Sequence, residues 1–299
     1  MINGAITAII TPMKTSGDVD FDEFEKLLAF QAENGVHGVV VNGTTGESPT
    51  LEPDELEKLL MLAVRKFKKA GTRFVIAGTG TNSTDKTIKN TIAAKKIGAD
   101  AALIVTPYYN KPNEKGLIKH FHLAADVGLP IIIYDIVGRT GRQIKTNEFK
   151  EIAKHPNVIG VKAASGNLDQ IKELMENVAL PIRKMGREFF VWSGDDGITH
   201  SVVEMGGNGV ISVISNLIPA KVLALATEKD PKRAAALADE LAPLAKAAFV
   251  ETNPVPIKYM MKLARLIKSD FVRLPLGELL DESKRHIDSA VDNHLFKSR

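Results

Sequence analysis

Three side chains in the middle of the sequence have the types and spacing for chemistry on a carbonyl compound that carries a carboxylate. Lys162 directly follows the apolar run VIGV. A lysine in apolar surroundings loses hydration, which lowers the pKa of its amine and frees it to attack a carbonyl carbon. Tyr134 ends a second apolar run, PIIIY, and a phenol beside an amine can transfer the protons that Schiff-base formation requires. Arg139 follows in a loop, and its planar guanidinium suits a substrate carboxylate.

Each of these side chains also has an ordinary structural explanation. A lysine at a strand end can extend its amine to solvent, and a tyrosine can be a core ring with a hydrogen-bonded hydroxyl. An arginine can form a surface ion pair of little energetic value. The motif GTTGES at residues 43–48 offers hydroxyls and amides for a second carboxylate, although a plain glycine turn explains it equally well. A catalytic role therefore depends on whether the fold brings these segments together.

Eight short segments have the composition of buried β-strands. Several are continuous apolar runs, such as VVV, AALIV and PIIIY, which is typical of strands covered on both faces in a parallel sheet. Amphipathic stretches that open with acidic or capping residues and close on glycine lie between them, at residues 20–35, 53–71 and 83–98. The strands are expected at residues 5–10, 38–41, 73–77, 101–105, 130–134, 158–162, 188–192 and 209–214.

Eight strands that alternate with helices over roughly 230 residues predict an α/β fold, a (β/α)8 TIM barrel. We expect this catalytic barrel to occupy residues 1–230. Residues 231–299 contain three stretches that each open at a proline and have the composition of helices. They predict an all-helical C-terminal extension.

The predicted barrel gathers the candidate residues at one end. Active sites of such barrels lie at the carboxyl ends of the strands, so residues 43–48, Tyr134 and Lys162 are predicted to meet there. Side chains alternate along a strand. If Lys162 points into the barrel, Gly160 and Val158 are therefore expected to point inward too, with Gly160 leaving space beneath the amine.

Composition excludes several classes of protein. The chain has 299 residues with 39 basic and 36 acidic side chains, so its net charge is only +3 and a basic nucleic-acid-binding face is not expected. It has no cysteine, which excludes disulfides, thiolate nucleophiles and cysteine-ligated metals. No apolar run reaches the length of a membrane span, and the start lacks the features of a secretion signal. We expect a cytoplasmic protein whose partners are small molecules rather than nucleic acid or membrane.

Other motifs do not predict a cofactor or a metal ion. AGTGTNS at residues 77–83 lacks the third glycine of a dinucleotide-binding fingerprint. His120 and His122 lie two apart on a predicted helix and therefore face different directions. Asp195 and Asp196 have no histidine at an adjacent strand end, so we interpret them as supporting or loop-capping residues. No metal site is predicted.

Several motifs, in order and spacing, resemble those of the pyruvate-dependent class I aldolases, the family of N-acetylneuraminate lyase and dihydrodipicolinate synthase. They are GTTGES, TPYYNKP, YDIVGRT, VIGVKAASGNLDQ, SGDDG, GNGVISV and ETNPVPIKY. The resemblance implies a lyase that condenses pyruvate with aspartate 4-semialdehyde in diaminopimelate and lysine biosynthesis. Relatives that act on sugar acids usually lack the arginine, so Arg139 favours the synthase branch. The alternatives are another pyruvate-dependent aldolase, acting on a sugar acid or hydroxy-oxoglutarate, and an inert barrel, against which the intact site residues argue.

The resemblance also implies a role for each site residue. Lys162 would form an imine with pyruvate, without a metal or organic cofactor, and Tyr134 would be the general acid/base, relayed through Thr44 to Tyr109. In the family the tyrosine that matches Tyr109 comes from the neighbouring subunit. The site would therefore be complete only in a dimer, within a homotetramer built as a dimer of dimers. The substrate-binding residues would be Thr45 for the pyruvate carboxylate, Arg139 for the semialdehyde carboxylate, Ile211 through its backbone, and Gly194.

The chain departs from the family pattern beside the tyrosine. Members commonly have Asn-Val-Pro or Asn-Ile-Pro there, whereas this chain has Asp135, Ile136 and Val137. If Tyr134 points into the barrel, Asp135 points to the helix layer, where a buried carboxyl needs a hydrogen bond or a cation. The missing proline is expected to loosen the loop that carries Arg139.

A second departure concerns regulation. Lysine-inhibited members bind lysine at the dimer interface, and typically have His and Glu where this chain has Leu56 and Lys86. A lysine side chain at position 86 would repel the cationic ligand, so we expect insensitivity to lysine. The other matching positions are Ser48, Pro49, Asn82 and Tyr108.

Overall fold

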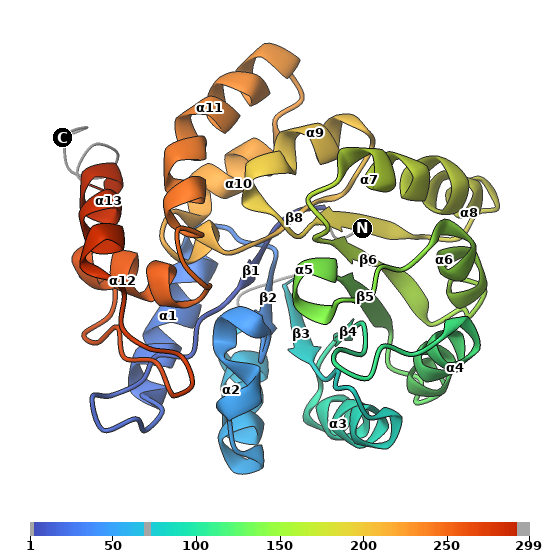
Figure 1. Ribbon diagram of the computed structural model, residues 1–299, viewed down its shortest axis with the longest axis horizontal. Helices are drawn as coiled ribbons and strands as arrows, with labels where there is room; N and C mark the ends of the chain where they lie inside the picture. The colour runs from blue at the N-terminus through green and yellow to red at the C-terminus, as the bar shows by residue number, and fades with distance from the viewer. Residues whose placement is uncertain (1–2, 69–72, 292–299) are drawn as a thin grey trace.

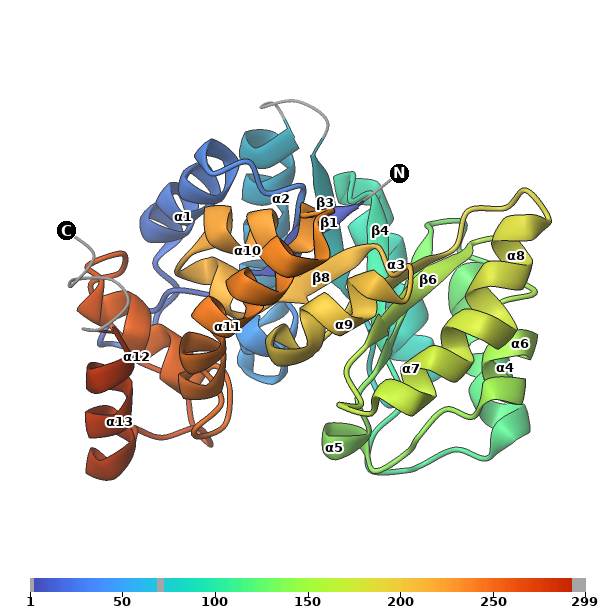
Figure 2. The same ribbon diagram turned by 90° about the horizontal axis from the view of Figure 1, so that it is seen from above.

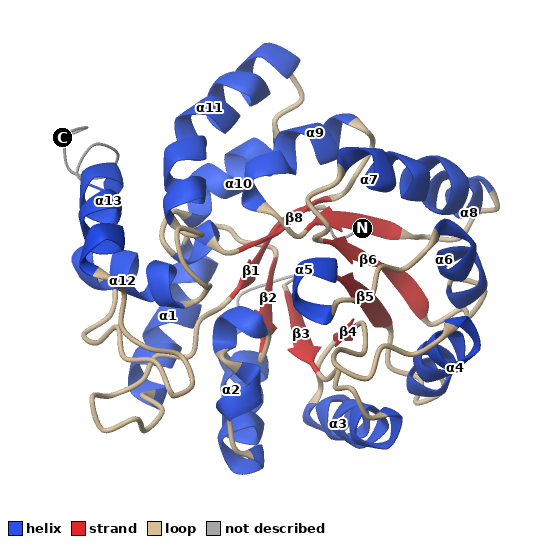
Figure 3. Ribbon diagram, viewed as in Figure 1, coloured by secondary structure: helices blue, strands red, loops and turns tan. Residues whose placement is uncertain are grey.

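Eight parallel strands close into a barrel, and helices surround it (Figure 1, Figure 3). The computed structural model describes residues 3–68 and 73–291. Each strand pairs with the next, and β8 pairs with β1, which confirms the predicted (β/α)8 fold. The strands are β1 (Gly4–Ala8), β2 (Gly38–Val41), β3 (Phe74–Gly78), β4 (Ala101–Val105), β5 (Ile131–Asp135), β6 (Val158–Ala163), β7 (Phe190–Ser193) and β8 (Gly209–Ser212).

Two strands end earlier than predicted because side chains take over their backbone hydrogen bonds. At the end of β1, Asn216 donates its amide to the carbonyl of Ala8 and accepts from the amide of Ile10. At the end of β8, the amides of Val213 and Ile214 bond to a side-chain carboxylate instead of a strand. The backbone therefore leaves the sheet two residues before each predicted end.

The helices cover the outside of the barrel. Those expected at residues 20–35 and 83–98 form as α1 and α3 behind the caps Asp20 and Ser83. The helix expected at residues 53–71 forms as α2, and its expected end at residue 71 lies outside the described residues. The helices are α1 (Phe21–Glu33), α2 (Pro53–Phe67), α3 (Thr84–Ile97), α4 (Glu114–Ala125), α5 (Val137–Thr140), α6 (Thr146–Ile152), α7 (Leu168–Leu174), α8 (Leu180–Lys184), α9 (Thr199–Glu204), α10 (Pro219–Thr227), α11 (Pro231–Ala247), α12 (Val255–Leu263) and α13 (Asp281–Val291).

The C-terminal helices pack against one side of the barrel, away from α4, α6 and α8 (Figure 2). Helix α11 contacts α9 and α10, and α12 and α13 contact each other. The last of these helices begins at Asp281, later than the proline at which we expected it. At the two ends of the segment before it, Arg273 bonds to Glu55 and the amide of Leu280 bonds to Glu251. The division at residue 230 stays a prediction, and residues 292–299 lie outside the described residues.

Apolar side chains form two layers, one inside the barrel and one between strands and helices. The inner layer holds Ile6, Val40, Ile132 and Ile211, and Trp192 lies there fully buried. The rings of Trp192 and Phe190 stack with their centroids 5.2 Å apart. This packed interior forms the floor below the strand ends. No helix within residues 3–68 and 73–291 is long and apolar enough to cross a membrane.

A bulge in β6 overturns one expectation about the strand that carries Lys162. Ile131 pairs with Val158, but Ile132 pairs with Gly160, so one extra residue lies on β6 between them. The extra residue breaks the alternation, and Val158 joins the layer against the helices instead of facing inward. Gly160 also differs from expectation. A Cβ there would lie 2.3 Å from the carbonyl oxygen of Phe190, so this glycine permits close approach of β7 rather than leaving open space.

Candidate active site

Lys162 and Tyr134 face each other at the carboxyl end of the barrel. They are register partners on β6 and β5, and both are buried, with exposed fractions of 5% and 7%. The amine Nζ of Lys162 lies 4.5 Å from the centroid of the Tyr134 ring. The predicted pairing of amine and phenol is therefore present within one chain.

Burial is the main electrostatic influence on Lys162. It lowers the pKa of the amine from 10.5 to about 8, because an ammonium ion in apolar surroundings loses its hydration. The value of about 8 already includes two smaller effects, since the carboxylate of Asp196 acts to raise the pKa and the cation of Arg139 acts to lower it. At neutral pH about a tenth of the amine is therefore uncharged and nucleophilic.

The Tyr134 hydroxyl connects the strand end to the loop after β2. Burial raises the pKa of the phenol, while Arg139 and a side-chain hydrogen bond with Thr44 act to lower it. Thr44 opens a short 3-10 turn, Thr44–Gly46. The hydroxyl thus has a neighbour with which it can exchange a proton, as the expected relay from Tyr134 to Thr44 requires.

Asp195 and Asp196 support the loop after β7, as expected. One carboxylate oxygen of Asp195 accepts a hydrogen bond from the amide of Gly197 at 2.9 Å. Asp196 is buried and accepts from the amides of Val213 at 2.9 Å and Ile214 at 3.1 Å. Asp196 has a second effect that no sequence motif indicated, because its charge acts on the Lys162 amine.

Gly194 makes room for the lysine side chain. A Cβ at this position would lie 2.6 Å from the Cβ of Ala164 and 3.1 Å from the Cε of Lys162. Any larger residue would therefore press against Ala164 and the methylene groups of Lys162. Ile211, the predicted backbone contact, is fully buried on β8 and pairs in register with Ile6.

Residues near the C-terminus hold the predicted carboxylate-binding groups. The amide of Asn253 donates to the hydroxyl of Thr45 at 3.0 Å, and Arg139 donates to the carbonyl of Asn253 at 3.1 Å. Glu47, in the same motif as Thr45, forms a fully buried ion pair with Lys258. Sequence reasoning missed both Asn253 and Lys258, although both lie in the motif ETNPVPIKY.

The segment that carries Arg139 has regular backbone hydrogen bonds. Residues 137–140 form one helical turn, α5, in front of the barrel (Figure 1). The amide and hydroxyl of Thr140 both donate to the carbonyl of Ile136, and the amide of Gly141 donates to that of Val137. The looser loop expected from the missing proline stays a prediction.

Asp135 finds the hydrogen bond that its burial demands. Its side chain faces the helix layer, where Gln170 donates to Oδ2 at 3.1 Å. The expectation that it points away from the barrel interior is confirmed.

Tyr109 does not join the other candidates within one chain. Its side chain is 90% exposed, and its backbone has a φ of 68°, which is unusual for a bulky residue. The neighbouring Tyr108 is partly exposed. The relay of Tyr134 and Thr44 therefore lacks its third member unless Tyr109 is supplied by another chain.

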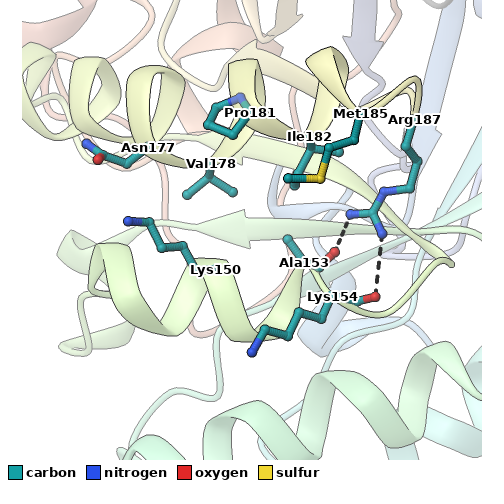
Figure 4. A pocket seen from close by; sticks show the side chains of 9 residues that line it. All are labelled: Lys150, Ala153, Lys154, Asn177, Val178, Pro181, Ile182, Met185 and Arg187. Atoms are coloured by element: carbon teal, nitrogen blue, oxygen red, sulfur yellow. Dashed lines mark hydrogen bonds between the residues drawn. The ribbon is translucent and has the colours of Figure 1, made fainter.

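One cavity adjoins the strand ends. It has a volume of about 430 Å³ and lies between the site loops, at Ile136 and Gly194, and Ala245, Lys246 and Phe249 at the end of α11. A cavity of about 510 Å³ lies elsewhere, between α6 and α8 (Figure 4). None of the candidate site residues lines that second cavity.

The two helix histidines diverge, as predicted. His120 is buried, bonds to the hydroxyl of Thr84 and has its pKa lowered by burial to about 4. His122 bonds to the carbonyl of Glu151. In the described part of the chain, no three His, Asp or Glu side chains gather in a way that could hold a metal ion.

The sequence matches known proteins along its whole length. The model of the Dihydrodipicolinate synthetase family matches residues 1–294. The 4-hydroxy-tetrahydrodipicolinate synthase of Hydrogenobaculum sp. is 40% identical, over 98% of this chain and 99% of that protein. The enzyme of the same name from Endomicrobium trichonymphae is 44% identical, over 97% of this chain and 98% of that protein.

Solved structures agree with these matches. The crystal structure of dihydrodipicolinate synthase from Thermotoga maritima superimposes with a TM-score of 0.93 at 38% identity, covering 98% of this chain and 99% of that one. The chloride-inhibited enzyme from Acinetobacter baumannii, solved with pyruvate, gives a TM-score of 0.91 at 37% identity, covering 98% and 99%. A third match, with a TM-score of 0.93 and 38% identity over 98% of both chains, is described as the first monomeric dihydrodipicolinate synthase variant.

Proposed function

This chain belongs to the dihydrodipicolinate synthetase family, and we propose that Lys162 and Tyr134 carry out its chemistry. The enzyme is a lyase that condenses pyruvate with aspartate 4-semialdehyde to 4-hydroxy-tetrahydrodipicolinate, in diaminopimelate and lysine biosynthesis. The observation that supports the assignment of residues best is the buried amine of Lys162, 4.5 Å from the Tyr134 ring.

Lys162 acts as the nucleophile. Its Nζ adds to the carbonyl carbon of pyruvate, and water leaves to give an imine. Loss of a methyl proton turns the imine into an enamine, whose carbon attacks the aldehyde carbon while the aldehyde oxygen gains a proton. The attack restores the imine, and the amino group of the semialdehyde then adds to the imine carbon, which closes the ring and releases the Lys162 amine. Tyr134, hydrogen-bonded to Thr44, moves these protons. The covalent imine replaces any separate cofactor.

Two sets of groups bind the carboxylates of the two substrates. Thr45, which accepts a hydrogen bond from Asn253, binds the carboxylate of pyruvate near the Lys162 amine. The backbone of Ile211 and Gly194 complete this part of the binding site. Arg139 binds the carboxylate of the semialdehyde, because its guanidinium lies close enough to act on both Lys162 and Tyr134. A sugar-aldehyde acceptor without a carboxylate would leave Arg139 without a role, which favours the semialdehyde.

The complete site needs a second subunit. Tyr109 is exposed and carries an unusual backbone conformation, as expected of a side chain that enters a neighbouring site and completes the relay through Thr44. One relative is described as the first monomeric variant, which implies that other members associate. We propose a homotetramer built as a dimer of dimers, and a cytoplasmic location in keeping with its metabolite substrates.

Covalent trapping tests this assignment. Wild-type enzyme treated with pyruvate and borohydride should gain the mass of one reduced pyruvyl group per chain, and Lys162→Ala should gain none. Lys246→Ala, which removes an exposed lysine from the neighbouring cavity, is the matched control and should label like wild type. Turnover is then compared with aspartate 4-semialdehyde and with N-acetylmannosamine. Labelling of Lys162→Ala, or turnover only with N-acetylmannosamine, would overturn the proposal.

A further inference from the structure

Asp135 is a buried carboxyl directly beside the catalytic strand ends. It is the last residue of β5, next to Tyr134, and only 2% of its surface is exposed. Its register partner Ala163 follows Lys162 on β6, and its carbonyl accepts from the amide of Ala164 at 2.9 Å. Asp135 is therefore attached to the ends of the two strands that carry Tyr134 and Lys162.

Two buried oxygen atoms lack a hydrogen-bond partner at this point. Gln170, in the first turn of α7, donates its amide Nε2 to Asp135 Oδ2 at 3.1 Å and to the carbonyl of Ile144 at 3.3 Å. The other oxygen of each side chain, Asp135 Oδ1 and Gln170 Oε1, is buried without a partner. Leaving both unpaired costs free energy.

The orientation of the Gln170 amide is fixed by its surroundings. The Ile144 carbonyl can only accept a hydrogen bond, so the nitrogen of the amide must face it. Turning the amide over would place its oxygen against this carbonyl and against Asp135. The unpaired Oε1 cannot be relieved in that way, whereas a proton on the Asp135 carboxyl would turn its Oδ1 from an acceptor into a donor.

The charged groups around Asp135 do little to favour its ionised form. Those that act on it are Arg142, after α5, and Glu148, on α6, with opposite effects. They also bond to each other, with Arg142 Nη1 at 3.1 Å from a Glu148 oxygen. The remaining support for the anion comes from the Gln170 amide and the backbone of Ile144.

We propose that Asp135 is a positioning residue that acts in its neutral form: its carboxyl proton lies between Asp135 Oδ1 and Gln170 Oε1. The resulting acid–amide pair ties α7 to the end of β5 and holds Tyr134 opposite Lys162. Burial raises the pKa of the Asp135 carboxyl to about 7, so the proton is present in the acidic half of the physiological range. Loss of the proton leaves the carboxylate charge of Asp135 facing Gln170 Oε1 and weakens the connection between α7 and β5.

The replacement Asp135→Asn is a matched test of this pair. Asparagine has the same shape, and its amide can donate to Gln170 Oε1 at every pH. It therefore keeps the pair without a titrating group. Gln170→Leu removes the partner and leaves Asp135 in place.

Infrared spectroscopy detects the proton directly and does not depend on the proposed function. The difference spectrum between wild type and Asp135→Asn should contain the C=O stretch of a protonated carboxyl well below pH 7. This band should decline with a midpoint near 7, and Gln170→Leu should shift its frequency. An absent band, or one unaffected by Gln170→Leu, would overturn the acid–amide pair.

Kinetics tests the positioning role, which rests on the proposed function. The ratio of kcat for wild type to kcat for Asp135→Asn should be near one well below pH 7 and should fall as the pH rises through about 7. A constant ratio across this range would refute positioning even if the infrared band titrates. Borohydride trapping of wild type and Asp135→Asn distinguishes a failure of the positioning role from a failure of the proposed function. Only a failure of the proposed function would abolish trapping in both proteins.

Discussion

The pH dependence of imine formation should reveal the lowered pKa of Lys162. Burial and Arg139 bring the pKa of the amine from 10.5 to about 8, a change that corresponds to about 3 kcal/mol. At pH 7 about a tenth of the amine is then neutral, against about 0.03% for an unperturbed lysine, a gain of roughly 300-fold in nucleophile. The sign follows from the protonation state, because only the neutral amine attacks and it accumulates as the pH rises.

The assay is the rate of pyruvate trapping by borohydride in a single turnover at several pH values. The rate should rise about tenfold per pH unit below 8 and become constant above it. Asp196→Asn removes a charge that raises the pKa of Lys162, so its profile should move to lower pH. Asp195→Asn changes a residue of the same loop that does not act on the amine. Its rate profile should therefore match that of wild type.

Two results would refute this reasoning. A rate that still rises at pH about 10 would mean that the Lys162 amine has an ordinary pKa and stays hydrated when pyruvate arrives. An Asp196→Asn profile that moves to higher pH would mean that the Asp196 carboxylate does not stabilise the ammonium form.

Three further predictions concern the acceptor site, the C-terminal segment and regulation. Arg139→Ala should raise the KM for the semialdehyde far more than that for pyruvate in steady-state kinetics, and equal effects would exclude Arg139 from the acceptor site. Lys258→Met leaves Glu47 buried without its cation and should lower the free energy of unfolding by about 3–5 kcal/mol. In chemical denaturation, the double variant Glu47→Gln/Lys258→Met should recover part of the stability lost in Lys258→Met. If the losses of unfolding free energy in the two single variants simply add in the double variant, the pairing is contradicted. Lysine should not inhibit, because Lys86 repels it, and half-inhibition below a millimolar would contradict this.

The fold and the central pair of residues could be predicted because the signals that specify them are local. Apolar runs of strand length alternate with capped amphipathic stretches, and each is set by residues within a few positions of each other. Once the strands are parallel, their carboxyl ends share one edge. Lys162 and Tyr134, at the ends of neighbouring strands, then have to lie side by side.

The rest was decided by contacts between distant parts of the chain. Asn253 bonds to Thr45 and Lys258 pairs with Glu47 across more than 200 residues, and no local pattern reports such a contact. The bulge at residues 158–160 reversed the direction of Val158 through pairing with β5, and Asp135 found Gln170 only because α7 folds back onto β5. Chain order and side-chain type therefore determined the barrel and its nucleophile. Burial, register and the neighbours of each charge, which exist only in the tertiary structure, determined the pKa values and the supports of the site.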